Sequence, residues 1–280
     1  MGLRRPTDKP ISELIDQAEK RIFAQYGDVV SVARKSKTLF KFGENADVGT
    51  AYETVWATGG DEAYVFTNAI THYSSSDASD DQLIDIQGFT IDANYKLAYV
   101  TQQVTLAGQT KSALTTPLAR VVRVANFGST DMAGTIYIYE DDTVVDGVPQ
   151  TASAIHITVK APQNQTLKCA TCTSDKEYWI ITDLTVGVKR TNNAAADFEI
   201  QVREVSSDEY AFRSVLFLSA SQAGPLTLNI DPPLIVPRNY DIRVRAIASA
   251  NATSVSAGLN GYLAQVIGRK DGTGRVVEVA

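Results

Sequence analysis

The stretch of sequence that decides the fold of this 280-residue chain alternates apolar with polar side chains. It reads Phe198-Glu199-Ile200-Gln201-Val202-Arg203. A second stretch repeats the alternation, as Tyr240-Asp241-Ile242-Arg243-Val244-Arg245-Ala246. Because successive side chains of a β-strand point to opposite faces, a period of two predicts strands with one face in a core and one polar face.

Segments of this kind recur along most of the chain, and their spacing predicts the fold class. We expect strands near 63–72, 83–93, 96–106, 119–126, 134–140 and 153–159, and again near 178–189, 197–204, 210–219, 225–230, 239–249 and 255–268. Closely spaced strands without helices between them are typical of antiparallel sandwiches. A jelly roll is the form that we favour.

Two proline-containing segments divide this β region. The polar stretch 161–165 begins at Pro162 and predicts a boundary between a first β-sandwich over 61–161 and a second, jelly-roll-like sandwich over 162–280. Asp231-Pro232-Pro233 predicts a crossing between sheets, because proline cannot donate a hydrogen bond to a central ladder.

Residues 1–60 differ in pattern and predict a helix followed by a docking arm. An apolar stripe of helical period covers 11–23 and comprises Ile11, Leu14, Ile15, Ala18, Ile22 and Phe23. This stripe needs a cover, which its own domain or another subunit could supply. The predicted fold class is therefore mainly β, with two antiparallel β-sandwich regions preceded by a short N-terminal helix and an extended arm.

The predicted arm carries the candidate partner-binding residues, in a stretch where basic residues alternate with aromatic ones. They are Leu39, Phe40, Phe42, Tyr52 and Trp56. Burying one such ring removes about 150–250 Å² from solvent, so rings on an arm suit a docking element. Two interpretations stay open: the rings dock on a partner, or they fasten the arm to its own first domain.

Composition and charge disfavour several classes of partner. The net charge is −6, which makes nucleic acid and anionic membranes poor electrostatic matches for the whole chain. No apolar run reaches the length of about 18 residues expected of a transmembrane helix. The first residues include Arg4 and Arg5 but no apolar core after them, so no secretory signal is expected.

The sequence offers little that predicts catalysis, a cofactor or a metal. Cys169 and Cys172 are spaced C-x-x-C, but a zinc ribbon needs a second pair. His72 and His156 lie in strand-like segments without a nucleophile motif. Acidic loops at 77–85 and 140–146 are interpreted as polar turns, with cation binding left open. We therefore expect no enzyme, no catalytic residue, no cofactor and no metal.

Three segments carry a resemblance to a known group of proteins. Residues 39–60 include Phe42-Gly43, Asn45, Glu53, Val55-Trp56 and Gly59-Gly60, and they resemble a recurrent "fG-N-D-v-T…E-vW…GG" stretch of structural proteins of tailed bacteriophages. Residues 71–80 resemble the serine-rich "SSS-xx-D" turn of that group. Residues 86–95 and 104–110 resemble its "i-GlD-n-n…vtLnGtt" hairpin, although Phe89 replaces the usual leucine and Ala107 the usual asparagine.

This resemblance covers roughly residues 39–110 and implies a structural protein of the virion. The favoured role is a capsid decoration or cement protein that binds the major capsid protein or other virion proteins and is itself a homotrimer. It implies no direct contact with nucleic acid or membrane, and a location in the virion after assembly in the host bacterial cytoplasm. Two alternatives remain: a neck, tail or fibre component, and a carbohydrate-binding receptor-recognition module.

Overall fold

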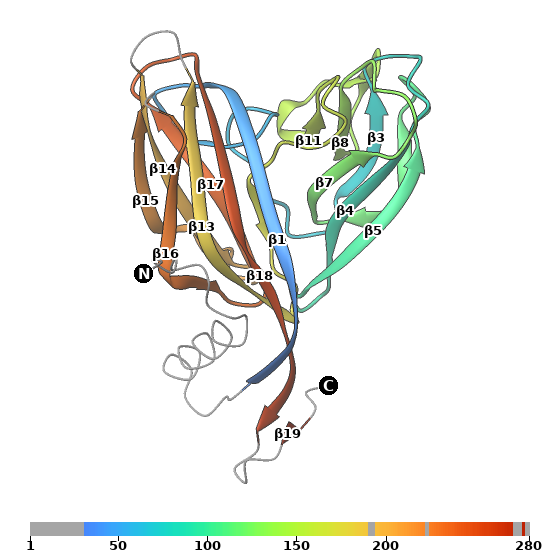
Figure 1. The fold of residues 1–280 in the computed structure, drawn as a ribbon. Helices are drawn as coiled ribbons and strands as arrows, with labels where there is room; N and C mark the ends of the chain where they lie inside the picture. The colour runs from blue at the N-terminus through green and yellow to red at the C-terminus, as the bar shows by residue number, and fades with distance from the viewer. Residues whose placement is uncertain (1–30, 190–193, 222–223, 271–275, 278–280) are drawn as a thin grey trace.

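The protein forms two β-sandwiches that lie side by side (Figure 1). The computed structural model describes residues 31–189, 194–221, 224–270 and 276–277. Within them one short 3-10 helix, Ala152–Ala154, accompanies the strands, so the predicted mainly antiparallel β class is confirmed. The helix predicted over 11–23 lies outside the described residues.

The first sandwich packs a four-stranded sheet, ordered β11-β8-β3-β6, against a three-stranded sheet, ordered β5-β4-β7. Its strands are β3 (Ile70–Ser75), β4 (Leu83–Ile91), β5 (Leu97–Thr105), β6 (Ser112–Leu118), β7 (Arg120–Asn126), β8 (Ile136–Glu140) and β11 (Ile155–Val159), with a small hairpin of β9 (Val144–Val145) and β10 (Val148–Pro149). Alternating residues such as Ile84 and Ile86 of β4 and Ile136 and Ile138 of β8 fill the core. The apolar faces of these two strands are buried as the sequence pattern predicts.

The second sandwich consists of two larger sheets with a Trp179-centred core between them. Its strands are β1 (Ser31–Val48), β12 (Ala170–Cys172), β13 (Glu177–Lys189), β14 (Ala195–Glu204), β15 (Arg213–Ser221), β16 (Leu226–Val236), β17 (Tyr240–Ala248) and β18 (Thr253–Lys270). One sheet has the order β1-β18-β13-β16 and the other β12-β17-β14-β15. Short strands β2 (Glu53–Thr54) and β19 (Val276–Val277) add to β17 and β18.

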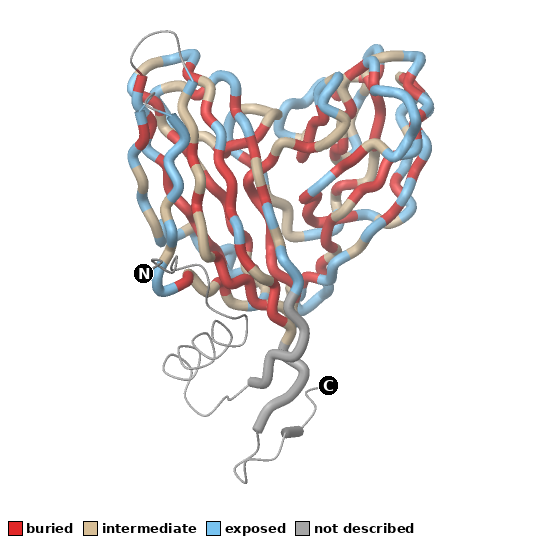
Figure 2. The backbone as a smooth tube through the Cα atoms, viewed as in Figure 1, coloured by how far each residue is buried: buried red, intermediate tan, exposed pale blue. Residues whose placement is uncertain are grey.

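The strand order of the second sandwich is interleaved. Numbered along the chain, its eight main strands run 1-8-3-6 in one sheet and 2-7-4-5 in the other. Eight antiparallel strands shared in this way between two sheets form a jelly roll. The first sandwich is inserted between the first strand of the jelly roll, β1, and the second, β12. Figure 2 shows that each sandwich has its own buried centre.

The membership of β1 in this sheet corrects the prediction for residues 31–48, which belonged to the predicted helix and arm over 1–60, and it corrects the contiguous second domain over 162–280. β1 pairs with β18 from Ser31 opposite Arg269 to Val48 opposite Thr253. Its inward positions include the buried polar residues Lys41 and Asn45, whereas Phe40 on the outward face is exposed. This inversion of the usual pattern is the physical reason that residues 31–48 look like an arm and not like a strand in the sequence.

The predicted sheet crossing at Pro232 and Pro233 is also corrected. Both prolines lie within β16, at the edge of its sheet. The register against β13 shifts there, since Ile181 lies opposite Leu234 while Asp183 lies opposite Asn229. Proline lacks a donor for a ladder hydrogen bond, and an irregular stretch of an edge strand tolerates this loss.

The two sandwiches share a buried interface of their own. Phe89, Ile91 and Leu97 of the first sandwich pack with Cys172 and Val205 of the second. Asn239 of the loop before β17 adds polar contacts: its Oδ1 accepts from the Leu97 amide at 2.8 Å, and its Nδ2 donates to the Tyr95 carbonyl at 2.8 Å. The interface therefore holds the two sandwiches together through both apolar packing and hydrogen bonds.

Candidate functional site

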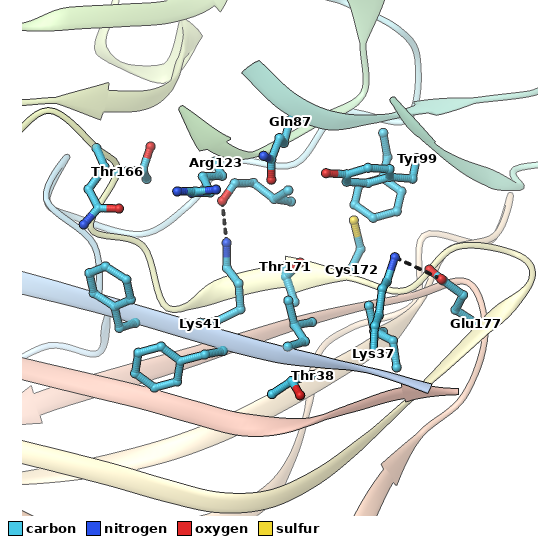
Figure 3. Close-up of a pocket in the computed structure, with 17 residues that line it drawn as sticks. Lys37, Thr38, Lys41, Gln87, Tyr99, Arg123, Thr166, Thr171, Cys172 and Glu177 are labelled. Atoms are coloured by element: carbon cyan, nitrogen blue, oxygen red, sulfur yellow. Dashed lines mark hydrogen bonds and ion pairs between the residues drawn. The ribbon is translucent and has the colours of Figure 1, made fainter. Parts of the chain in front are cut away.

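A cleft of about 420 Å³ lies beside β1, between the two sandwiches (Figure 3). Residues from both faces of β1 line it, including Lys41 from the inward face and Phe40 and Phe42 from the outward face. In the described part of the chain β1 pairs only with β18, so its other edge carries no strand. The opposite wall comes from β4, β5 and β7 of the first sandwich, and the cleft therefore follows the free edge of β1.

Lys41 extends from β1 toward the first sandwich in this cleft. Its Nζ donates to the Val122 carbonyl at 2.5 Å, and only 8% of the side chain's surface is exposed. No described carboxylate forms an ion pair with it. Burial, and secondarily the positive charge of Lys168, lower the pKa of Lys41 to about 8. The fold thus holds a lysine in a place where its charged form is disfavoured.

Two further cations line the same cleft. Arg123 of β7 is exposed, and its side chain makes no hydrogen bond or ion pair with any residue that the structure describes. The Lys37 Nζ lies 3.3 Å from a Glu177 carboxylate oxygen and 5.7 Å from the centre of the Tyr99 ring. Three cations face one carboxylate here, so the cleft has a formal charge of +2 in a chain whose net charge is −6.

The buried charge of Lys41 predicts that its removal stabilises the protein. We expect Lys41→Met to raise the free energy of unfolding at pH 7 by about 1–3 kcal/mol, because an apolar side chain avoids the desolvation of the ammonium group. In wild type the lysine is neutral in the folded state above pH 8 but still protonated in the unfolded chain up to about pH 10.5. The destabilising contribution of Lys41 is therefore largest below pH 8 and fades as the pH rises toward 10.5.

Urea unfolding of wild type and Lys41→Met between pH 7 and pH 10 measures this effect. The exposed Lys160, replaced by methionine, serves as a matched control with an expected change within about 0.5 kcal/mol. A difference between wild type and Lys41→Met that stays constant over this pH range would contradict the assigned cause.

A second cluster of charged residues joins the sandwiches and is fully covered. The Asp241 carboxylate of β17 accepts a hydrogen bond from the Arg120 Nε at 2.8 Å and another from the Arg203 Nη2 at 2.7 Å. Burial opposes ionisation of Asp241, but the two guanidinium groups outweigh it and keep the pKa of this carboxyl below its usual value. The centre of the Tyr64 ring lies 4.6 Å from the Arg203 guanidinium carbon. This cluster holds the fold together and leaves no open position for a ligand.

The sequence-predicted partner-binding residues divide between the cleft and buried positions. Leu39, Phe40 and Phe42 line the cleft, and the Phe40 and Phe42 rings stack with centres 5.5 Å apart. Tyr52 lies under Arg245 with 5.3 Å between ring centre and guanidinium carbon, away from the cleft.

Trp56 is buried by its own chain, with 2% of its surface exposed. Its Nε1 donates to the Gly60 carbonyl at 3.0 Å, and the Lys168 ammonium lies 5.2 Å from the ring centre. Of the two interpretations left open for Trp56, its burial favours the second, in which the ring fastens this segment to its own chain. Lys41 was not among the predicted site residues, although the basic residues between aromatic ones in 34–42 were an available signal, and Arg123 carried no such signal.

The two cysteines, His156 and the acidic loop at 77–85 are buried or hydrogen-bonded within the fold. Cys169 and Cys172 are free and buried, and burial raises the pKa of the Cys169 thiol to about 12. His156 Nε2 lies 3.0 Å from Glu140 Oε1, while burial lowers the pKa of the histidine. In the loop at 77–85, the Asp80 carboxylate accepts hydrogen bonds from the backbone amides of Ala133 at 2.8 Å and Gly134 at 3.0 Å. In the part of the chain that the structure describes, no three His, Cys, Asp or Glu residues are grouped so as to hold a metal.

A third surface lies at the lateral edge of the jelly roll, where β15 and β16 end their respective sheets. A groove of about 830 Å³ runs there, lined by Leu216, Ile230 and Leu234. Large apolar side chains stand exposed nearby on the same two strands, namely Val215, Phe217 and Leu226, with 63% of Phe217 open to solvent. Unpaired strand edges with exposed apolar residues are typical sites of protein contact.

These observations define the chain as a two-sandwich β protein whose open features are surfaces and a cleft. No protein-family model matches the sequence, and no curated protein matches it. No helix among the described residues is long and apolar enough to cross a membrane.

Solved structures give weak likenesses only. T=1 particles derived from infectious bursal virus share 10% identity at a TM-score of 0.26, over 89% of this chain and 75% of that one. A Sulfolobus turreted icosahedral virus structure shares 10% identity at a TM-score of 0.15, over 84% of this chain and 96% of the other. A Bacillus thuringiensis Cry1Da tryptic core variant shares 7% identity at a TM-score of 0.17, over 73% and 53%. At TM-scores this low, the likenesses carry no argument about function.

Proposed function

We propose that this protein is a structural component of a bacteriophage virion, and that it acts as a capsid decoration or cement protein. The observation that carries the proposal is the lateral edge of the jelly roll, with its groove and the exposed apolar side chains of Val215, Phe217 and Leu226. The sequence resemblance to tailed-phage structural proteins over residues 39–110 supports the same role. Jelly rolls also occur among viral capsid proteins, which is support by fold analogy alone.

In this role the lateral edge is the contact with identical copies or with the head lattice. A rigid sandwich that buries apolar surface where lattice subunits meet adds binding energy to the lattice, and no chemical reaction is needed. A junction with threefold symmetry requires a partner with matching symmetry, so we propose that the protein assembles as a homotrimer. Its partners are then the major capsid protein and its own copies.

Copy number tests this role directly. Quantitative mass spectrometry of purified particles is expected to find the protein in several hundred copies, in a fixed ratio to the major capsid protein. A count corresponding to one ring or one fibre would assign it to the neck or tail instead. Mature particles without the protein would overturn the virion role as a whole.

The lateral edge predicts the effect of one substitution on assembly. We expect Phe217→Ser to weaken self-association or particle binding at least tenfold, because the exposed ring loses its buried area in the contact, and about 1.4 kcal/mol corresponds to tenfold. The free energy of unfolding of the isolated chain should change by less than about 0.5 kcal/mol, since the ring is exposed there.

Sedimentation and binding to particles stripped of the protein measure the two effects. Phe127→Ser is the matched control, because Phe127 is equally prominent, 59% exposed, on the first sandwich. Equal effects of the two variants, or none from Phe217→Ser, would remove the lateral edge from the assembly contact.

A further inference from the structure

The free edge of β1 borders the cleft over one short stretch. Residues 37–42 line the cleft, and among the described residues their backbone makes no backbone–backbone hydrogen bond outside the ladder with β18, although the Cys169 Sγ donates to the Lys41 carbonyl at 3.7 Å. At Gly43, the next residue along β1, the inward face is covered, because a Cβ placed there would lie 2.2 Å from the Val55 carbonyl oxygen and 2.4 Å from the Cys169 amide nitrogen. An edge strand offers a row of unpaired donors and acceptors that an incoming extended chain can use.

The length of this stretch suits a short extended peptide. A strand rises about 3.3 Å per residue, so the open edge accommodates roughly six residues of an added strand. Figure 3 shows Lys41, Lys37, Arg123 and Gln87 directed into the space between β1 and the first sandwich. The occupant of this space therefore meets the backbone of β1 on one side and polar and charged side chains around it.

The charges decide what kind of peptide fits. The Arg123 guanidinium has no ion-pair or hydrogen-bond partner within the described residues. The Lys41 ammonium has only a backbone carbonyl, and Glu177 is the one carboxylate in the lining. Cations without carboxylate partners in a partly desolvated cleft favour an anionic ligand. The stacked rings of Phe40 and Phe42 add an apolar surface at the same edge, so apolar side chains of the ligand also find contacts there.

We propose that this cleft binds an extended acidic segment of a partner protein, which adds as a strand to the free edge of β1 while Lys41 and Arg123 bind its carboxylates. The segment carries acidic residues at alternate positions, because side chains of an extended chain alternate between its two sides. This inference deepens the proposed function by giving the chemistry of a partner. It concerns binding by the purified chain and is tested independently of whether virions contain the protein.

Selection from a random dodecapeptide display library, with the full-length chain as target, tests the recognition. The expected outcome is enrichment of Asp and Glu at alternate positions. The enriched peptide, made synthetically, should bind at least tenfold more weakly to Arg123→Gln and to Lys41→Met, and unchanged to Lys160→Gln, in which an exposed lysine outside the cleft is replaced. Binding should also weaken as salt is added.

Failure to fold does not obscure this test, because Lys41→Met is expected to be more stable than wild type. No enrichment, enrichment of basic or purely apolar peptides, or equal binding by all variants would overturn the proposal. Displacement of the peptide by low millimolar inorganic phosphate would assign the cleft to small anions. Tighter binding of a single-stranded oligonucleotide than of the peptide would assign it to nucleic acid.

Backbone methylation tests the strand addition separately. In an added strand, alternate amides of the ligand face β1. N-methylation of one alternate set of amides should abolish binding at concentrations tenfold above the original Kd, and methylation of the other set should be tolerated. Tolerance of both sets would show that the side chains alone are recognised, which would overturn strand addition.

Discussion

Asp241→Ala is expected to lower the free energy of unfolding by about 3–5 kcal/mol, because removal of one partner from a buried ion pair leaves the other charges uncompensated. Asp241 is fully buried and binds Arg120, which comes from the first sandwich, and Arg203, which comes from the second. Its loss leaves two buried guanidinium groups without a counter-charge. Urea unfolding at pH 7 measures the change.

Asp61 supplies the matched control. It also pairs with two arginines, Arg243 at 3.1 Å and Arg245 at 3.3 Å, but 43% of its side chain is exposed. Asp61→Ala should therefore lower stability by no more than about 1 kcal/mol. Equal losses in the two variants would mean that burial does not set the strength of these pairs.

Acid should reveal the same interaction in wild type. The folded-state pKa of Asp241 lies below that of the unfolded chain, so its stabilising contribution is present above the ordinary carboxyl pKa and disappears as the pH falls through the lowered value. Below about pH 4, the wild type should therefore lose stability more steeply than Asp241→Asn. Parallel curves in that range would contradict the assignment.

Trp56→Ala is expected to lower the free energy of unfolding by about 3–5 kcal/mol, the usual range for a buried tryptophan. The change removes the ring beside the Lys168 ammonium and the hydrogen bond from Nε1 to the Gly60 carbonyl. Lys168 itself is buried and pairs with Glu62 at 2.5 Å, so the loss of the ring also exposes that ion pair to rearrangement. Thermal and urea unfolding measure the loss.

Phe40→Ala is the contrasting variant, because 52% of Phe40 is exposed at the cleft. It should change stability by less than about 1 kcal/mol while it weakens binding of the acidic peptide. The reverse result, with a stable Trp56→Ala and an unstable Phe40→Ala, would contradict the division of these rings into a buried position and a cleft position.

The sequence predicted the strands well where one face is apolar and the other polar. β14 and β17 are examples, because Phe198, Ile200 and Val244 enter the core as their alternation indicates. β1 was not predicted as a strand because Lys41 and Asn45 occupy its inward positions and Phe40 lies on its outward face. β12 was not predicted because its three residues, Ala170–Cys172, are too few to show an alternating pattern.

Part of the candidate site could be predicted from the sequence and part could not. Leu39, Phe40 and Phe42 were selected because large apolar side chains without an evident core suit docking, and they line the cleft. Arg123 was not selected, because it looks like one more polar residue on the outer face of β7. It becomes part of a site only when the two sandwiches pack and place β7 opposite β1.

The sequence by itself determined that the chain is mainly β and which side chains alternate into cores, because a period of two is a local property that a few consecutive residues display. Tertiary structure alone decided that β1 pairs with a strand more than 200 residues away, from Ser31 opposite Arg269, since no local pattern records the partner of a strand. Tertiary structure also decided that Asp241 is buried and paired with two arginines. The alternation places Asp241 on the polar face of β17, and only the packing of the first sandwich over that face turns a solvated carboxylate into a buried, doubly paired one.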